Sequence, residues 1–521
     1  MLRRLLLLLA LLVMPGVAHA EWYEASTPHF VVYSDDSPEA VKRFATNLER
    51  FDKALRFLRN LSDEPIGKAN RVTIYLLKDV AAIGRLAGNS GVAGFYIPRA
   101  GGSVAFAPRR ADEGNVPPEF RDLLLSPLQI LLHEYTHHFL LSLSPNVAYP
   151  AWFVEGYSEF FAPSVFEADG SVIIGRPPQY RSWDLQGSEQ KLSMTRMLTT
   201  APRKLNPEQR YLIYARGWLL THYLFISGKR DGQLGAYLRA LTEGKTPEEA
   251  AQAFGDLRKL DSELWTYRRT ELGAQRISAA ALPVGEVTIR KLGPAEAATM
   301  DVRIRSDRGV NEDQAKDVYA AARAACAPYP NDPAAQRVLT EAAFDAGDFA
   351  GAEAAADRIL TVQPNNVDAL LYKARARMAV AVKAKDMTPA TWTPIRRLIA
   401  TANKADTENP AVLWLFYQSY VQAGIKPSQA AKDGLYYAYV LAPQDRTLRF
   451  DVAESYLRDG NLAQARALLL TIARDAHAGT SGELADRVID AIEAGNPAAA
   501  IEEIDKSRRE AEEKAKGKRK G

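Results

Sequence analysis

The second half of the chain contains a repeat, and this repeat constrains its fold more than any other feature. Pro330 and Pro364 are 34 positions apart, Pro410 and Pro443 are 33 apart, and the 46 positions between the pairs equal one period plus an insertion near 383–393. Units of this length cannot bury an apolar face alone, so neighbouring units must stack. The alanine-rich composition therefore predicts a linear array of helix pairs, with a plain helical bundle as the alternative.

Two segments show the repeat most clearly. They are AAFDAGDFAGAEAAADRILTVQPNN and AESYLRDGNLAQARALLLTIARDA, each with a turn of small, glycine and polar residues before a helix of small and apolar residues. Over 311–475 the chain resembles the tetratricopeptide family. The resemblance implies an all-α repeat domain, which we place at 311–490, and a possible protein partner on the repeats. The charged residues at 491–521 are expected to form a disordered tail, with a frayed charged helix as the alternative.

The first part of the chain mixes strand and helix patterns. Alternating or β-branched runs predict strands at 30–34, 72–76 and 101–107. Helical spacing predicts helices at 38–58, 126–144, 152–161, 207–226 and 232–243. We therefore expect an α+β domain over 21–275. The β-rich stretch at 276–310, which contains GEVTIRKLGP and MDVRIRSDRG, is expected to be a linker or a small β hairpin.

The first twenty residues have the pattern of a secretory signal. A basic start at Arg3 and Arg4 precedes the apolar run Leu5 to Val13, and Ala18 to Ala20 offers small residues for cleavage after Ala20. A membrane anchor is the alternative, but the run is shorter than the roughly twenty residues of a spanning helix. Because Cys326 is the only cysteine, no intramolecular disulfide can form. Export to a bacterial periplasm is the expectation.

Composition excludes several partner classes. The chain is 47% hydrophobic and 25% charged, with a net charge of only +3, so no strong field favours nucleic acid. After the signal, we expect no integral membrane segment, because no later stretch is both long and apolar enough.

His133-Glu134-Tyr135-Thr136-His137 carries the clearest chemistry, inside a helix expected to begin with Ser126 as its N-cap and Pro127. Residues four apart share one face of a helix, so His133 and His137 can bind one zinc ion. Glu134 lies one step around the helix, where it can act as general base toward a water molecule. The alternative is a surface helix with coincidental histidines.

Trp152 to Phe160 (WFVEGYSEF) resembles the W-x-x-E-G-x-x-E-[FY] signature of gluzincins, the zinc peptidases that include aminopeptidase N-like and thermolysin-like enzymes. The resemblance implies a zincin-like fold and makes Glu155 the third zinc ligand. It also implies that Glu159 hydrogen-bonds His133 and so orients it. A solvent-exposed carboxylate is the alternative for Glu159.

Tyr214-Ala215-Arg216-Gly217 resembles the Y-x-K-G segment of the aminopeptidase N-like branch. The resemblance implies that Tyr214 donates to the oxyanion of the reaction intermediate. Arg216 replaces the lysine of that segment, which preserves the charge but not the donor geometry. Tyr211, one helical turn away, is the rival candidate, and core packing is the alternative for both tyrosines.

One element of the aminopeptidase pattern is missing. No Gly-x-Met-Glu-Asn segment occurs, and GGSVAFA at 101–107 stands in its place. This strand could still pair with an extended peptide. We therefore expect an exported zinc metallopeptidase, an endopeptidase rather than an aminopeptidase, that acts on a peptide or protein substrate. The alternative is an exported repeat scaffold whose zinc domain is catalytically idle.

Overall fold

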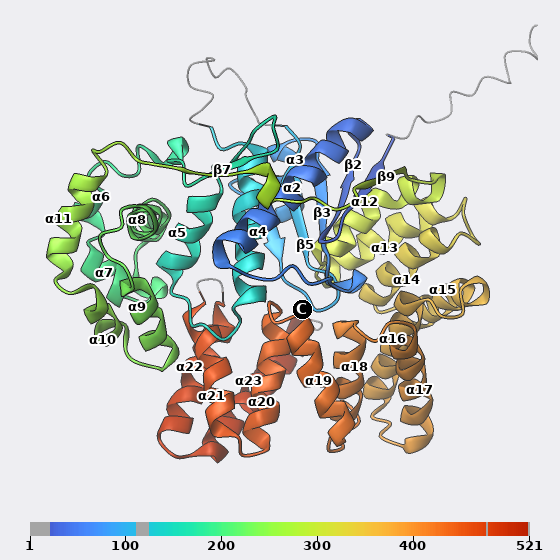
Figure 1. Ribbon diagram of the computed structural model, residues 1–521. Coiled ribbons are helices and arrows are strands. Elements are labelled where there is room, and N and C mark those ends of the chain that lie inside the picture. The colour runs from blue at the N-terminus through green and yellow to red at the C-terminus, as the bar shows by residue number, and fades with distance from the viewer. Residues whose placement is uncertain (1–20, 111–123, 476–477, 519–521) are drawn as a thin grey trace, which may run out of the picture.

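The computed structural model describes residues 21–110, 124–475 and 478–518. Figure 1 shows two parts: a domain of mixed strands and helices, blue to green, and an array of helices, yellow to red, that curves along one side of this domain and beneath it. The expected signal peptide at 1–20 lies outside the described residues. Within the described ranges, no helix meets the length and hydropathy that crossing a membrane requires.

A six-stranded mixed sheet organises the first part. Its strands are β1 (Tyr23–Ser26), β2 (Phe30–Ser34), β3 (Val72–Leu77), β4 (Phe95–Ile97), β5 (Val104–Pro108) and β9 (Thr288–Lys291). Their spatial order is β4-β5-β3-β2-β1-β9. The central strands β2, β3 and β5 run parallel, whereas β4, β1 and β9 run antiparallel to their neighbours. Because parallel neighbours need crossover connections, a helix follows β2 and another follows β3.

Helices cover this sheet and extend the domain away from it. They are α2 (Pro38–Arg59), α3 (Val80–Ala87), α4 (Pro127–Leu143), α5 (Ala151–Phe161), α6 (Ser188–Lys191), α7 (Met194–Thr199), α8 (Pro207–Ile226), α9 (Gln233–Thr242), α10 (Pro247–Ala251) and α11 (Leu257–Tyr267). A second sheet of three short strands joins β6 (Val165–Phe166), β7 (Val172–Ile174) and β8 (Gln275–Ile277). The apolar faces of most of these elements form one core, whereas Ile83 on α3 packs in a second cluster with other residues of the large sheet.

Helix α4 begins where the sequence predicts. Ser126 accepts a hydrogen bond from the backbone of Gln129, whose side chain reaches back to the backbone of Ser126. Pro127 occupies the first position of the helix. The helix packs beneath β4 and β5 and beside α5.

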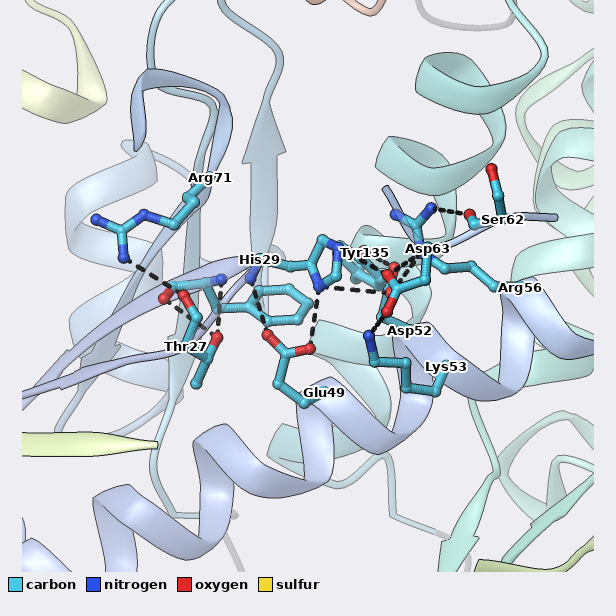
Figure 2. A network of polar contacts seen from close by, with 11 residues as sticks. Thr27, His29, Glu49, Asp52, Lys53, Arg56, Ser62, Asp63, Arg71 and Tyr135 are labelled. Carbon is cyan, nitrogen blue, oxygen red and sulfur yellow. Dashed lines mark hydrogen bonds and ion pairs between the residues drawn. The ribbon is translucent and has the colours of Figure 1, made fainter. Parts of the chain in front are cut away.

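A buried polar network also holds α4 (Figure 2). The hydroxyl of Tyr135 on α4 donates to Oδ1 of Asp52 on α2 at 2.6 Å, and Oδ2 of Asp52 accepts from Arg56 at 2.6 Å. His29, which directly precedes β2, contacts Glu49 Oε2 through Nδ1 at 3.0 Å. The network ties β2, α2 and α4 together.

The second part consists of antiparallel helix pairs. Its helices are α12 (Pro294–Arg308), α13 (Glu312–Cys326), α14 (Pro333–Asp345), α15 (Phe349–Val362), α16 (Val367–Ala384), α17 (Pro389–Ala405), α18 (Pro410–Val421), α19 (Gln429–Leu441), α20 (Arg446–Arg458), α21 (Leu462–Arg474), α22 (Thr480–Glu493) and α23 (Pro497–Lys518). Helices α14 and α16 begin 34 residues apart, as do α20 and α22. The insertion near 383–393 lengthens α16 and α17 to 18 and 17 residues. The repeat predicted from the prolines is present as a tetratricopeptide-like array.

The expectation for the segment 276–310 was wrong. The stretch 276–310 is not a free linker: β9 completes the edge of the large sheet beside β1, and MDVRIRSDRG lies mostly in helix α12. The buried side chains of Met300 and Ile304 pack against the sheet, which favours the helix over the strand that the local pattern indicates.

For the charged end of the chain, the structure has the helix that was the alternative to a disordered tail. Residues 497–518 form helix α23, which packs against α22 and α20. Ala500 and Ile504 are buried there, and Arg508 pairs with Glu454 on α20. The apolar residues of this helix form only a narrow stripe, because only one face of the helix packs against the array. The charged residues therefore dominate the composition of the segment.

The array contacts the mixed domain along its inner face. Asp445, at the N-terminus of α20, accepts a hydrogen bond from the backbone of Ala100 at 2.7 Å. Arg203 pairs with Asp486 on α22 at 2.9 Å. A charged cavity lies between α14, α16, α18 and the large sheet.

Candidate metal centre

Three side chains from α4 and α5 converge at one point. Nε2 of His133 lies 3.1 Å from Nε2 of His137, and Oε2 of Glu155 lies 3.3 Å from the first nitrogen and 3.6 Å from the second. The two histidines share a helix face because they are four residues apart. Glu155 arrives from the next helix, where it is buried.

This geometry fits a tetrahedral zinc ion. With zinc–ligand distances near 2.0 to 2.2 Å, the edges of a ligand tetrahedron measure about 3.3 to 3.6 Å. The three observed distances lie close to this range. Two imidazoles and one carboxylate leave the fourth corner open, as catalytic rather than structural zinc sites do. The donor set and its spacing therefore suit the metal that the sequence predicts.

The contacts behind the ligands select the protonation state that metal binding needs. The hydroxyl of Ser158 donates to the backbone carbonyl of Val154 at 3.0 Å, so its oxygen accepts from Nδ1 of His137 at 3.2 Å. A proton on Nδ1 leaves the lone pair of Nε2 directed at the other two ligands. Ser158 lies within the WFVEGYSEF segment, but no local sequence signal predicts this role.

Negative charge surrounds His133. Burial alone would lower the pKa of His133, but the hydrogen bond to Glu155 and the charges of Glu159, Glu155 and Glu134 outweigh burial and raise it to about 9. The cluster thus holds a proton in the absence of a cation. A divalent cation would satisfy the same carboxylates and displace that proton.

Glu159 lies behind His133, but its strongest contacts are with other residues. Its Oε1 is 3.6 Å from Nδ1 of His133, which is an ion-pair distance rather than a hydrogen bond. Oε1 accepts from Nη2 of Arg181 at 2.7 Å, and Oε2 accepts from the hydroxyl of Tyr180 at 2.7 Å. The expected hydrogen bond to His133 is therefore not formed. Tyr180 and Arg181 lie in a short 3-10 helix, Gln179–Arg181, in which the sequence shows no recognisable motif.

A cavity of about 550 Å³ opens in front of these residues. Its lining includes His133, Glu134 and His137 on α4 and Tyr214 on α8. Glu134 is half-buried and faces the same space as the ligands without being one of them. The general base expected from the sequence thus borders the space in which a substrate would lie.

Of the two tyrosines, only Tyr214 lines this cavity among the described residues. Its ring stacks on that of His133 with centroids 5.9 Å apart, and the guanidinium of Arg181 lies 4.9 Å from its ring centre. Burial raises the pKa of the Tyr214 hydroxyl, and the charges of Glu155 and Glu134 act in the same direction, so the group remains a donor at neutral pH. Tyr211 is 52% exposed.

Arg216 does not reach the cavity. Its side chain is buried on the opposite face of α8, where it pairs with Asp261 and donates to Ser188 at 3.4 Å. The substitution of arginine for lysine in the Y-x-K-G segment therefore has a structural use here and leaves the cavity unchanged.

Two glycines allow α8 to approach α5. A Cβ atom on Gly156 would lie 2.2 Å from the carbonyl carbon of Gly217, and one on Gly217 would lie 2.4 Å from the carbonyl oxygen of Trp152. These residues belong to the two segments that resemble gluzincins. The close crossing places Tyr214 beside the ligand set.

The strand available to a peptide is not the one expected. The segment 101–107 contributes β5, which lies between β3 and β4 and has both edges paired. Strand β4 forms the edge, and in the described part of the chain its one strand neighbour is β5. Gly94, Phe95 and Tyr96, at the start of β4, line the cavity. Backbone pairing with an extended substrate would therefore use β4.

The remaining histidines lie away from the ligand cluster. His138 contacts the hydroxyl of Tyr96 at 2.7 Å, and burial lowers its pKa to about 3. His222 is buried and contacts the hydroxyl of Tyr267 and the carbonyl of Gly273, as expected of a core histidine. His29, Asp52 and Asp63 could also hold a metal by geometry, but Lys53 and Arg56 already neutralise these carboxylates. His477 lies outside the described residues.

Comparison with known proteins identifies no family for the whole chain. No protein-family model matches it, and neither does any curated protein. Similar solved structures include a thermophilic TPR protein from Thermus thermophilus, with 16% identity and a TM-score of 0.31, and the MamA RS-1 ArsTM double mutant, with 16% identity and a TM-score of 0.26. Each match covers 37% of this chain and 95% of the other chain. Scores this low carry no argument, so the repeat assignment rests on the helix pairs themselves.

Proposed function

We propose that this protein is a zinc-dependent endopeptidase of the gluzincin type. The observation that carries the proposal is the convergence of His133, His137 and Glu155 at tetrahedral spacing, with Glu134 and Tyr214 facing the same cavity. We also propose that the enzyme acts after export, because the first twenty residues have the pattern of a secretory signal.

His133, His137 and Glu155 would hold the metal. When bound, zinc would lower the pKa of a water molecule and polarise the carbonyl of a peptide bond. Glu134 is placed to accept a proton from water in the cavity and to return it to the leaving amine. The Tyr214 hydroxyl donates a hydrogen bond to the oxygen on which negative charge develops. Strand β4 holds the substrate backbone in an extended conformation.

The absence of a motif for binding a free amine favours cleavage within a chain. The described part of the cavity wall carries Glu134, Glu159 and Asp475, but Glu159 is already paired with Arg181 and Tyr180, and Asp475 is paired with Arg446. A substrate ammonium would therefore compete with an existing ion pair.

The test combines metal analysis with a digestion assay on the purified full-length protein. We expect about one zinc per chain and cleavage of casein or a mixed peptide pool that a chelator abolishes. Glu134→Gln should keep its zinc and lose at least about a hundredfold in rate, since a positioned base contributes that much or more. Glu208→Gln, on the exposed surface of α8, is the control and should behave as wild type.

Two results would contradict the proposal. Undiminished cleavage by Glu134→Gln would remove the proposed base. Zinc bound without cleavage of any peptide in the pool would favour the alternative, an exported repeat scaffold with an idle zinc domain.

A further inference from the structure

The repeat array forms part of the wall of the catalytic cavity. Besides residues of α4, α5 and α8, the cavity is lined by Arg446 and Arg449 on α20, Thr471 on α21 and Asp475, which follows α21. More than two hundred residues separate these side chains from the ligand set in sequence. All the residues that resemble gluzincin motifs lie in the mixed domain. The repeat array supplies a further part of the wall of their cavity.

The position of this wall is fixed by contacts next to the substrate edge of the sheet. Asp445 accepts from the backbone of Ala100, and the side chain of Gln444 donates to the carbonyl of Arg99 and to the hydroxyl of Ser103. These residues lie between β4 and β5. The start of α20 is therefore attached to the loop that follows the edge strand.

Arg449 is a buried cation with incomplete pairing. It is 4% exposed, and its guanidinium donates to Thr471 Oγ1 at 2.7 Å and to the carbonyl of Pro443. Its Nε has no hydrogen-bond partner among the described residues, and none of their carboxylates forms an ion pair with it. Burial lowers the pKa of Arg449, which reflects a charge that its surroundings do not fully compensate.

Arg446 lies on the same wall and is more accessible. It forms an ion pair with Asp475, and its Nη2 donates to Oδ1 of that residue at 3.3 Å. Arg446 and Glu134 line the same cavity. Two arginines face one carboxylate here, and the wall therefore carries an excess of positive charge.

We propose that Arg446 and Arg449 bind a carboxylate of the substrate peptide, so that the enzyme selects acidic peptides. The inference rests on the proposed peptidase function and names the substrate class for the same cavity. Arginine donates two parallel hydrogen bonds to a carboxylate, and such charge-assisted bonds are strongest where water is excluded. The carboxylate can belong to an aspartate or glutamate side chain or to the C-terminus of the peptide.

Peptide binding to the full-length Glu134→Gln protein tests this without relying on hydrolysis. The probes are dye-labelled heptapeptides that carry Glu or Gln at one position at a time, each with a free C-terminal acid or an amide. Fluorescence anisotropy should show a preference of about tenfold or more for Glu over Gln at one position, or for acid over amide, because a hydrogen bond to a charged group contributes at least that much. A preference for Glu over Gln would show that a side-chain carboxylate binds. A preference for the acid over the amide would show that the C-terminal carboxylate binds.

Adding Arg446→Gln should abolish this preference while affinity for the neutral peptide is retained. Adding Arg449→Lys, which keeps the charge but loses the paired donors, should weaken the preference for the charged peptide. Arg466→Gln on α21, where Arg466 pairs with Glu493 outside the cavity, is the control and should leave it unchanged. Circular dichroism checks that each variant is folded.

Equal binding of charged and neutral peptides, no binding of any peptide, or a preference that persists in Arg446→Gln would overturn this inference. These outcomes are distinct from failure of the proposed function. A wild-type protein that cleaves peptides without charge preference contradicts the carboxylate site alone, whereas a charge-dependent binder that never cleaves contradicts the peptidase.

Discussion

Three nearby residues of α8 have three different environments. Tyr211 lies on the surface, Tyr214 borders the cavity and stacks on His133, and Arg216 is buried against Asp261. The helical rotation of about 100° per residue separates them, so a single motif supplies a site residue and a structural ion pair. Arg181 lies near both tyrosine rings and connects them to Glu159.

Replacing Tyr214 by phenylalanine tests its role directly. If its hydroxyl donates to the developing oxyanion, Tyr214→Phe should lower kcat by about 10² to 10³ with little change in KM, because the lost bond forms mainly in the transition state. Steady-state kinetics on a cleaved peptide measures both constants. Tyr211→Phe is the matched control on the same helix and should stay close to wild type. An equal loss in the two variants would assign both tyrosines to packing.

At the scale of elements, the crossing of α5 and α8 decides whether the site forms. The two helices meet backbone to backbone at Gly156 and Gly217, with no room for a Cβ on either residue. Such a contact allows Glu155 on one helix and Tyr214 on the other to face the same cavity. The glycines in the two motifs are thus required by packing and not by the chemistry of the reaction.

Gly156→Ala should therefore destabilise the protein by about 1 to 3 kcal/mol, the usual cost of overpacking a tight core. The measurement is chemical unfolding together with zinc affinity, and we expect both to fall. Gly235→Ala on α9 is the control, since open space surrounds Gly235 and alanine favours the helix by up to about 1 kcal/mol. A Gly156→Ala protein with unchanged stability would show that α5 and α8 can move apart without a cost in unfolding free energy.

At the scale of the whole molecule, the repeat array packs against the mixed domain and lines two of its cavities. Its inner helices α14, α16 and α18 share a charged cavity with the large sheet, and α20 lines the cavity in front of the candidate metal centre. The inner face that the tetratricopeptide resemblance offers to a protein partner therefore contacts this chain's own first domain.

Removing the metal should weaken the folded state. Binding to the native protein alone contributes about 4 kcal/mol at a free zinc concentration a thousandfold above Kd. We expect a chelator to lower the thermal unfolding midpoint and zinc to restore it, whereas calcium, which prefers oxygen ligands, should not. His137→Ala should abolish the response to zinc. A zinc-dependent midpoint that survives this substitution would place the metal elsewhere.

Local sequence signals were sufficient to predict many elements and part of the candidate site. Ser126 with Pro127 predicts the start of α4, the four-residue spacing of His133 and His137 places both imidazoles on one face, and the proline period predicts the helix pairs. In each case the physical cause acts within a few residues or within one repeat, through a cap, a helical turn or a stacking face.

Only the tertiary structure decided the rest. Arg181 and Ser158 contact site residues that lie on other elements. Strand β4, and not the segment 101–107, forms the edge of the sheet. The segment 497–518 is helical, with one face buried against the array. Arg446 and Arg449 reach the cavity across more than two hundred residues of chain. Such contacts depend on how whole elements pack, which the local pattern around each residue does not encode.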